Sequence, residues 1–474
     1  MPERFERRIY LLNPRELSPE AIAVTFAKTS RSPLSFRKIA AELTNEESAQ
    51  FHEKWVVGYG HASVAEHAVL HLAFENVSRL AIECIESNRL ASYTEKSTRY
   101  QKWESDRYFV PQEILGTPHE VPYRSTCDRL FQAYQDSLGA VREVVVSRFP
   151  PEQGESEERL ERRLRSRYVD ACRFLLPAAS LANVGMTANA RALEHAISKM
   201  LSHPLQEVRQ IGREAREVST AEVPTLVKYA EAVPYFEQTA KDLRVRSKDV
   251  VSRESPDMLT LIHHDPEAED RVLASALYQQ GSMPFESALS HVQRLEAGDR
   301  QQLAQVLLGS RDRFRAPLRV LEHSGYTFEA LMDQGAYFEV KRHRMMTQTA
   351  QPLTANLGYA VPRLISDAGQ EGRYREAMEE AAEAYRGLAE WNPHVASYVV
   401  PNGFRRMVLM TLNLREAYHF CELRSAANAH FSVRRIALRM AEILRQVHPN
   451  LASFMRLPKD ADWRQIESEH FTQV

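Results

Sequence analysis

A row of cations stands out between Lys341 and Thr349, where the sequence reads KRHRMMTQT. Arginine presents a planar fork of donors that can hold two oxygens of a phosphate, and it stays charged at neutral pH. Cations at the end of a helix also stabilise the helix dipole without any ligand. The triplet Arg342-His343-Arg344 alone therefore leaves two interpretations open, an anion site and an ordinary helix end.

The overall composition limits what this stretch could serve. The chain has 474 residues, a formal net charge of -2 and 43% hydrophobic residues. This length predicts two or three domains, and the near-neutral charge does not favour bulk binding of nucleic acid. No apolar run reaches membrane-spanning length, the N-terminus has no hydrophobic signal core, and the four cysteines stand singly. We expect a soluble cytoplasmic protein that binds neither membranes nor nucleic acid.

Several motifs occur twice along the chain, in the same order in each half. Four such matches indicate a duplication rather than chance. We place its boundary near the polar stretch after Lys241, which gives repeats over residues 1–240 and 241–474. The matched pairs are Glu66-His67 with Glu322-His323, Arg89 with Arg344, Tyr108–Pro111 with Tyr359–Pro362, and Thr187–His195 with Thr411–His419.

Each half has the same predicted order of elements. The segment AVLHLAFE alternates like a half-buried strand, and SRLAIECIES, which follows it, has helical spacing of its apolar residues. The cationic stretch lies at the end of the matching helix in the second half. Long charged helices are expected to finish each half, including RALEHAISKML and the run from Met407 to Gln446. GESEERLERRLRSR, residues 154–167, is expected to form a solvated helix face. The pattern is α+β with helices dominant.

The two copies have kept different polar residues. Opposite Arg342-His343-Arg344 the first half has Ser87-Asn88-Arg89, which lacks two of the three. The first half instead has Glu95, Ser97 and Arg99, where the second half has TAQPLTAN and lacks all three. A folded duplicate needs neither set for its core. The complementary losses indicate one composite site built from both halves.

These residues resemble the flavin-dependent thymidylate synthase family. The first half resembles it in GHASVAEH, RLASYTEKSTRY and RFLLP followed by TANAR, and the second in KRHRMMTQT and NLREAYHFCELR. The resemblance implies an α+β fold of two tandem domains, each with a small antiparallel sheet and long helices. It also implies FAD-dependent methylation of dUMP to dTMP, with methylenetetrahydrofolate and NADPH as co-substrates. Neither half carries the family motif intact.

The resemblance also assigns roles to single residues. It implies that Arg424 polarises the pyrimidine and is the catalytic residue. Met200 and Ser397 are the counterparts of Arg424 and Arg173 in the other half, so both losses follow the complementary pattern. The residues implied for the nucleotide are Glu95, Ser97, Arg99, Arg173 and Arg342. The residues implied for FAD are His61, Ser63, Glu66, Arg342, His343, Arg344, Asn413, Arg415 and His419, with no metal.

The family works as a homotetramer whose active sites are shared between chains. The resemblance therefore implies that a homodimer of this two-copy chain imitates the tetramer, with half of the sites intact.

Three alternatives stay open. His61, His67 and His71 are close in sequence and could hold a metal, although such histidines more often make local hydrogen bonds. A non-catalytic nucleotide or RNA binder would use the same cations with Tyr337 and Phe338 for stacking. A relative acting on another uridine nucleotide, or one that has lost activity, would also explain the incomplete motifs.

Overall fold

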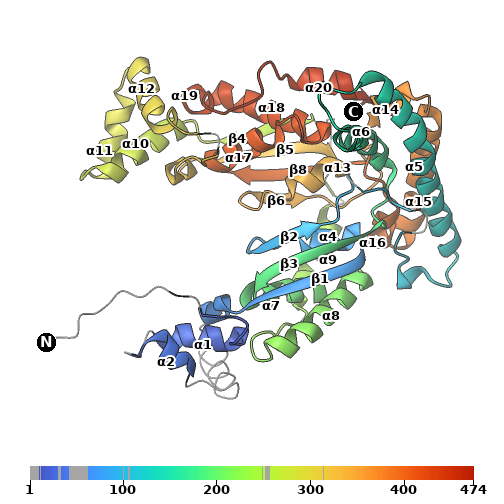
Figure 1. Cartoon of the computed structure of the whole chain (residues 1–474), viewed down its shortest axis with the longest axis horizontal. Helices are drawn as coiled ribbons and strands as arrows, with labels where there is room; N and C mark the ends of the chain where they lie inside the picture. The colour runs from blue at the N-terminus through green and yellow to red at the C-terminus, as the bar shows by residue number, and fades with distance from the viewer. Residues whose placement is uncertain are drawn as a thin grey trace. The chain divides into compact units, whose positions relative to one another are not determined.

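The computed structural model describes residues 10, 12–29, 32, 34–41, 62–99, 101–104, 107–247, 249–250, 257–312 and 314–474 (Figure 1). The contacts divide the chain into two compact units. Unit 1 comprises Met1–Lys96, Phe109–Leu115 and Leu181–Val251, and unit 2 comprises Ser97–Tyr108, Gly116–Ser180 and Ser252–Val474. Each unit contains a small antiparallel sheet with helices, which confirms the predicted α+β class.

Unit 1 is built on a three-stranded antiparallel sheet in the order β1-β3-β2. The predicted half-buried strand is β1, and the predicted helices after β1 and β3 are α4 and α7. Helices α7 and α8 pack against each other beside the sheet. The elements of unit 1 are α1 (Pro19–Thr29), α2 (Phe36–Ala41), the 3₁₀ helix η2 (Ala62–His67), β1 (Val69–Ser78), α4 (Arg79–Ile85), β2 (Ala91–Glu95), η3 (Gln112–Ile114), β3 (Leu181–Asn189), α7 (Ala190–Leu201), α8 (Gln206–Glu222) and α9 (Pro234–Ser247).

Unit 2 repeats this order and adds one strand. Its main sheet runs β4-β5-β8-β6, in which β5, β8 and β6 correspond to β1, β3 and β2. A second, two-stranded sheet joins β7 to β9. The strands of unit 2 are β4 (Leu259–His264), β5 (Tyr326–Asp333), β6 (Thr347–Ala350), β7 (Val361–Pro362), β8 (Arg405–Leu412) and β9 (Phe471–Gln473).

One predicted helix is wrong at its start. The run from Met407 was expected to be helical, but residues up to Leu412 lie in β8, and the helix α17 begins only after Asn413. Strand β8 is hydrogen-bonded on both sides, to β5 and to β6. Its run is apolar even at Leu409, which is 40% exposed, so the sequence lacks the alternation of a half-buried strand and cannot be told from a helix by periodicity.

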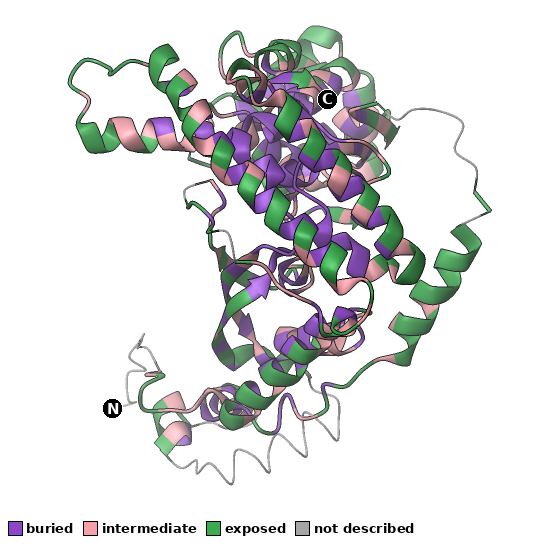
Figure 2. Ribbon diagram, turned by 90° about the vertical axis from the view of Figure 1, so that its right-hand side faces the viewer, coloured by how far each residue is buried: buried purple, intermediate pink, exposed green. Residues whose placement is uncertain are grey.

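The helices of unit 2 come from both sequence repeats. Helix α5, from the first repeat, packs against α6 and against α15 from the second. Its buried residues include Tyr123, Cys127, Leu130 and Tyr134, at helical spacing along one side. Figure 2 shows the long helices with buried residues on one side and exposed residues on the other. The helices of unit 2 are α5 (Glu120–Arg148), α6 (Glu157–Cys172), η4 (Arg173–Leu175), α10 (Ala268–Gln280), α11 (Phe285–Gln293), α12 (Ala297–Leu308), η5 (Arg319–Glu322), α13 (Gln334–Val340), α14 (Arg363–Asp367), α15 (Glu371–Trp391), α16 (Pro393–Ala396), η6 (Ser397–Val399), α17 (Leu414–Arg424), α18 (Phe431–Val447), α19 (Pro449–Ala452) and α20 (Trp463–His470).

The predicted solvated helix is α6. Ser156 caps its N-terminus by accepting the N–H of Arg159, and its first two turns are mainly exposed. The later residues, from Tyr168 to Cys172, are buried. The charged run therefore forms a solvated face, as predicted, and the apolar end of the same helix joins the core.

Two matching segments of the repeats pair with each other inside unit 2. Pro177 faces Pro401 in an antiparallel bridge. The N–H of Ala178 donates to the carbonyl of Val400, and the N–H of Asn402 donates to that of Leu176, so each bond has a counterpart in the other direction. This reciprocity means that an approximate two-fold axis relates the two segments.

The tyrosines of the repeated Tyr-x-Val-Pro motif make matching contacts as well. The hydroxyl of Tyr108 donates to Asp128 over 2.9 Å, and that of Tyr359 donates to Glu379 over 2.8 Å. Each acid lies the same distance along the chain from its tyrosine.

Among the described residues, no helix is both long and apolar enough to cross a membrane.

Candidate functional site

The cationic triplet follows directly on the helix α13, as the sequence predicts. Asp333 caps the start of α13 by accepting the N–H of Ala336 over 2.8 Å, and the helix ends at Val340. Helix α17 begins in the same way, because Asn413 accepts the N–H of Glu416 over 3.0 Å. The two caps fix where α13 and α17 begin, and the functional side chains project from these helices and the residues after them.

A chain of hydrogen bonds joins α13 to α17. Arg424 donates from Nε to Nε2 of His343 over 2.9 Å, and its Nη1 donates to Oε2 of Glu339 over 2.5 Å. Nδ1 of His343 lies 2.9 Å from Oε1 of Glu416. Because Nε2 accepts from Arg424, Nδ1 must carry the proton and donate it to Glu416. The tautomer of His343 and the plane of the Arg424 guanidinium are therefore set together.

Burial keeps this histidine neutral. The side chain of His343 is 1% exposed, and burial lowers its pKa despite the hydrogen bond to Glu416. A doubly protonated ring could not accept from Arg424. The neutral ring therefore holds Arg424 in place over the physiological pH range.

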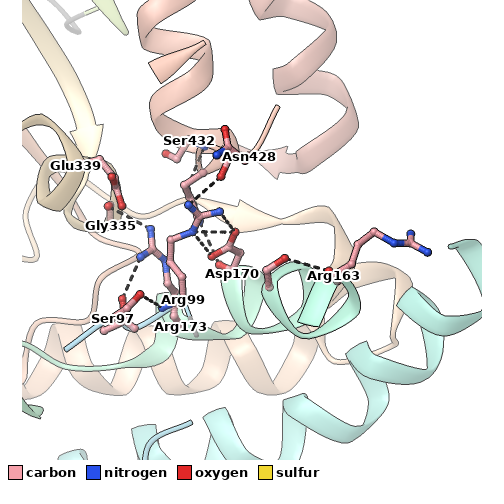
Figure 3. A network of polar contacts seen from close by, with 12 residues as sticks. Ser97, Arg99, Arg163, Asp170, Arg173, Gly335, Glu339, Asn428 and Ser432 are labelled. Carbon is pink, nitrogen blue, oxygen red and sulfur yellow. Dashed lines mark hydrogen bonds and ion pairs between the residues drawn. The ribbon is translucent and has the colours of Figure 1, made fainter. Parts of the chain in front are cut away.

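Two arginines from the first sequence repeat lie in the same unit (Figure 3). Arg99 forms a two-point pair with Asp170, from Nε to Oδ1 over 2.9 Å and from Nη2 to Oδ2 over 2.8 Å. Its Nη1 donates to the carbonyl of Asn428 over 3.1 Å. Ser97, a predicted nucleotide contact, accepts the backbone N–H of Arg99 over 3.2 Å.

Arg173 is the most deeply buried of these arginines. It is 2% exposed and donates to Oγ1 of Thr98 over 3.0 Å and to the carbonyl of Gly335 over 3.3 Å. Its Nε–H has no hydrogen-bond partner among the residues that the structure describes. Burial lowers the pKa of Arg173 to about 10, so the guanidinium is still charged at neutral pH. A buried cation with an unpaired donor is costly unless an anion compensates it.

Gly335 leaves the space that Arg173 occupies. A Cβ atom at this position would lie 3.0 Å from Oδ1 of Asp333 and 3.5 Å from Nη2 of Arg173. The matching residue of the first repeat is Leu80. A side chain of that size would collide with the guanidinium, so glycine is the residue that lets Arg173 approach α13.

The charges of four guanidinium groups act on one carboxylate, Glu339, and one of the four, Arg424, contacts it directly. Burial opposes the ionisation of Glu339, but the positive charges around it outweigh this effect and lower its pKa. Asp170, which pairs with Arg99, and Asp333 also act on these cations. We call the four residues that act on Glu339 the arginine cluster; they are Arg99, Arg173, Arg342 and Arg424.

The residues predicted for flavin in the second repeat lie around the same helix ends. Arg342 and His419 are exposed, Arg344 is half-buried, and the ring of His419 lies 5.1 Å from that of His343. Arg415 donates to the carbonyl of Pro317 over 2.9 Å and to Glu322 over 3.1 Å. The exposed Arg342 and the exposed imidazole of His419 could contact an anionic aromatic ligand, while Arg415 and Asn413 also make structural contacts.

The remaining predicted residues fall in unit 1. Glu95 is buried and pairs with the buried Arg79 over 2.6 Å, and Glu66 pairs with Arg191 over 2.5 Å. Ser63 is exposed. His61 lies outside the described residues. The predicted roles of these four residues in binding ligand therefore stay predictions.

The metal alternative gains no structural support. The ring of His67 packs at a tilt against Phe26, with the centroids 4.9 Å apart, and Nδ1 of His71 lies 2.8 Å from Oγ1 of Thr187. Over the part of the chain that the structure describes, no group of three or more His, Cys, Asp or Glu side chains is arranged to hold a metal ion.

The sequence motifs missed the acids of the site. Asp170, Glu339 and Glu416 were not predicted, yet each contacts or neutralises a predicted residue. Asp170 precedes Arg173 by three residues, and Glu339 precedes Arg342 by three. On a helix this spacing places two side chains on one face, which is the signal that could have found these two acids.

A hollow of about 580 Å³ lies in unit 1, along β1 and α8. Its ionisable lining residues are His71, Glu75, Glu214 and Glu222. Three carboxylates do not suit a phosphate ligand. The hollow is also distinct from the arginine cluster, whose four residues belong to unit 2.

Comparison with known proteins gives a consistent family. The family described as thymidylate synthase complementing protein matches the chain twice, over residues 14–225 and 260–450. A UPF0159 protein of Chlamydia muridarum is 31% identical over 92% of this chain and 90% of its own length. A UPF0159 protein of Thermoplasma acidophilum is 30% identical over 89% of this chain and 91% of its own.

More distant relatives have named activities. A flavin-dependent thymidylate synthase of Clostridium tetani is 26% identical over 45% of this chain and 82% of its own. The solved structure of the flavin-dependent thymidylate synthase of Helicobacter pylori, complexed with FAD and dUMP, is 20% identical and covers 43% of this chain and 100% of its own, with a TM-score of 0.32. The double match confirms the predicted tandem copies. The chain therefore belongs to the thymidylate synthase complementing protein family.

Proposed function

We propose that this protein methylates dUMP to dTMP with FAD, methylenetetrahydrofolate and NADPH, at a composite site that both repeats build. One observation carries the proposal. Arg99 and Arg173, from the first repeat, act on the same carboxylate, Glu339, as Arg342 and Arg424 from the second. Cations far apart in sequence thus act together in unit 2, which supports binding of an anionic substrate there.

The phosphate of the nucleotide would bind at Arg173 and its neighbours. The buried guanidinium of Arg173 has an unpaired Nε–H among the described residues. A phosphate dianion would supply an acceptor for this N–H and add negative charge next to the guanidinium. Asp170 and Asn428 hold Arg99 beside it, so this part of the site is organised before the ligand arrives.

The pyrimidine would face Arg424. Attack on a one-carbon group from C5 of uracil develops negative charge on the ring, and a fixed cation stabilises that charge. The hydrogen bond to His343 restricts the orientation of the Arg424 guanidinium before the substrate binds. Arg424 is therefore the residue to which we assign the catalytic role.

The residues at the ends of α13 and α17 fit FAD. Arg342 and Arg344 flank a neutral imidazole, and His419 offers a second, exposed ring next to it. Cations suit the pyrophosphate of the cofactor and imidazoles suit its planar ring. Bound FAD would supply the hydride chemistry, while the protein positions the nucleotide and stabilises charge.

An RNA-binding role fits these residues less well. Phe338 is 2% exposed, so its ring is not available for stacking on a base. The guanidinium of Arg406 covers the ring of Tyr337, with its carbon 4.5 Å from the centroid. Stacking platforms for single-stranded RNA need open aromatic faces.

The direct test is turnover by the purified protein. The protein is mixed with dUMP, methylenetetrahydrofolate and NADPH, and dTMP is measured, with UMP replacing dUMP in a parallel reaction. We expect a yellow protein with flavin absorbance and dTMP that appears only when every component is present. Methylation of UMP alone would move the proposal to another uridine nucleotide, and a colourless protein without turnover would refute it.

We also propose a homodimer in which each chain replaces two subunits of a tetramer. Only the composite sites would then bind flavin, because the other set lacks the triplet. The expected stoichiometry is one FAD per chain in a dimer, measured by absorbance and by light scattering. Two FAD per chain, or a fully active monomer, would contradict this arrangement.

A further inference from the structure

Glu339 is the carboxylate on which all four charges of the arginine cluster act, and a ligand anion would be attracted by the same charges. It lies one helical turn before the triplet, and its side chain is 8% exposed. Its carboxylate accepts from Nη1 of Arg424 over 2.5 Å, so the carboxylate and the catalytic arginine are a tight pair. The charges of Arg342, Arg173 and Arg99 act on the same carboxylate.

The acid has no counterpart in the first repeat. Cys84 occupies the position that matches Glu339, and Met200 occupies the position that matches Arg424. Met200 is buried and Cys84 is half-buried, and burial raises the pKa of the Cys84 thiol to about 11. The repeat therefore folds without this ion pair. The pair is retained only in the copy that also carries the cationic triplet, which ties it to the ligand rather than to the core.

We propose that Glu339 is an internal counter-anion of the nucleotide site, which competes with the bound nucleotide for Arg424 and for the charge of the arginine cluster. The inference rests on the proposed function and adds to it a residue that sets nucleotide affinity. Without substrate, the carboxylate compensates guanidinium groups that would otherwise be buried without an anion. When a phosphate arrives, two anions share the same cations, so Glu339 weakens binding and favours release of the product.

The test is to remove the charge and measure anion binding. We expect Glu339→Gln to bind inorganic phosphate and dUMP at least ~10-fold more tightly than the wild-type protein, because like-charge repulsion is relieved. Glu380→Gln is the matched control, since it removes one carboxylate from an exposed pair with Arg129 in the same unit. This control should change both affinities by less than ~2-fold, as surface charges contribute little.

A gain of affinity is a result that a damaged fold does not produce. Calorimetry gives the dissociation constants, and thermal unfolding shows that the variant is folded. If Glu339→Gln does not fold, Glu339→Ser removes the same charge and leaves more space. Unchanged or weaker binding of phosphate in a folded variant overturns the inference.

The outcomes also separate the inference from the proposed function. If the charge-removed variant binds phosphate more tightly but neither protein methylates dUMP, the counter-anion stands and the thymidylate synthase activity fails. If the wild-type protein makes dTMP while the variant binds phosphate no more tightly, the activity stands and the counter-anion is wrong.

Discussion

The ends of α4 and α13 occupy matching places in the two repeats, yet their surroundings differ in kind. In the second repeat, ionic hydrogen bonds link α13 to α17. In the first, Nδ2 of Asn88 donates to the carbonyl of Ile85, and Nζ of Lys199 donates to Oγ of Ser87 over 2.6 Å. The differing pairs are Glu339 with Cys84, His343 with Asn88, Glu416 with Ala192, and Arg424 with Met200.

The positions that play the same part in both repeats are those that cap the helices. Ser78 and Asp333 cap matching helices, and each accepts the N–H three residues later. Asn189 and Asn413 do the same for α7 and α17. Because the first repeat keeps its asparagine cap without the ionic chain, capping alone explains why asparagine stands at 413. The difference between the copies, rather than their likeness, points to the ligand site.

The largest expected effect on activity comes from changing Arg424. A lysine keeps the charge. Its single ammonium group cannot donate to both His343 and Glu339 and contact a substrate at the same time, as the planar guanidinium can. We expect Arg424→Lys to lower kcat/KM for dUMP by ~10³-fold, in the range seen when a preorganised charge stabiliser is lost. Arg89→Ala, in the repeat without the ionic chain, should change it by less than ~3-fold, as expected for an exposed side chain. Equal losses in the two variants would contradict the assignment.

Arg173→Met tests the buried cation from the first repeat. We expect the dissociation constant for dUMP to rise by ~100-fold, since a buried charge that pairs with the ligand is lost. Stability should stay the same or rise, because methionine fills similar space and needs no counter-ion. Calorimetry and thermal unfolding measure the two effects. Arg142→Met, on the exposed face of α5, is the control and should leave both quantities unchanged.

His343→Asn makes the second repeat like the first at one position. Asparagine is shorter than histidine, so Arg424 loses its fixed partner and Glu416 loses its donor. We expect kcat/KM to fall by ~30-fold, less than on loss of Arg424 itself, because the reacting charge is still present. The reverse change, Asn88→His, should give no gain, since Ala192 and Met200 supply no partners. A large effect of Asn88→His on turnover would argue against this interpretation.

The smallest effect concerns pH and His470. Burial lowers its pKa to about 4, and its ring stacks on Phe431 at 4.7 Å. The unfolded chain therefore binds a proton that the folded chain does not between pH 6.5 and about 4. The contribution of the neutral His470 to the free energy of unfolding is complete above pH 6.5 and decreases as the pH falls. We expect His470→Phe to reduce the slope of unfolding free energy against pH by at most ~1.4 kcal/mol per pH unit in urea titrations. An unchanged slope would refute this.

Short-range patterns predicted the frame well. The alternation in β1 and the helical spacing in α4 and α7 were visible because each of these elements buries one face. The start of β8 was missed because its exposed face carries the apolar Leu409, so the polar alternation of a half-buried strand is absent. The division into compact units was also not predictable, since α5 and α6 join the second repeat through contacts distant in sequence. The repeat boundary at residues 240 and 241 stays a prediction about the sequence.

Within the candidate site, the cations were easier to predict than the acids. Arg342, Arg424 and Arg173 stand out because the repeats can be compared position by position. Glu339 and Asp170 are single acids in a chain rich in them, and only helical spacing relates them to an arginine. Their importance comes from burial, which the sequence does not give directly.

The reciprocal pairing around Pro177 and Pro401 has a genetic consequence. In a symmetric pair of identical chains, any substitution enters both sides of the axis at once, so a gain on one side must be tolerated on the other. Here the two sides are encoded separately. Arginine can stand at 173 while its counterpart, Ser397, packs instead and donates to the carbonyl of Leu353 over 2.8 Å. Because both copies lie in one chain, each position can be substituted independently of its counterpart across the axis.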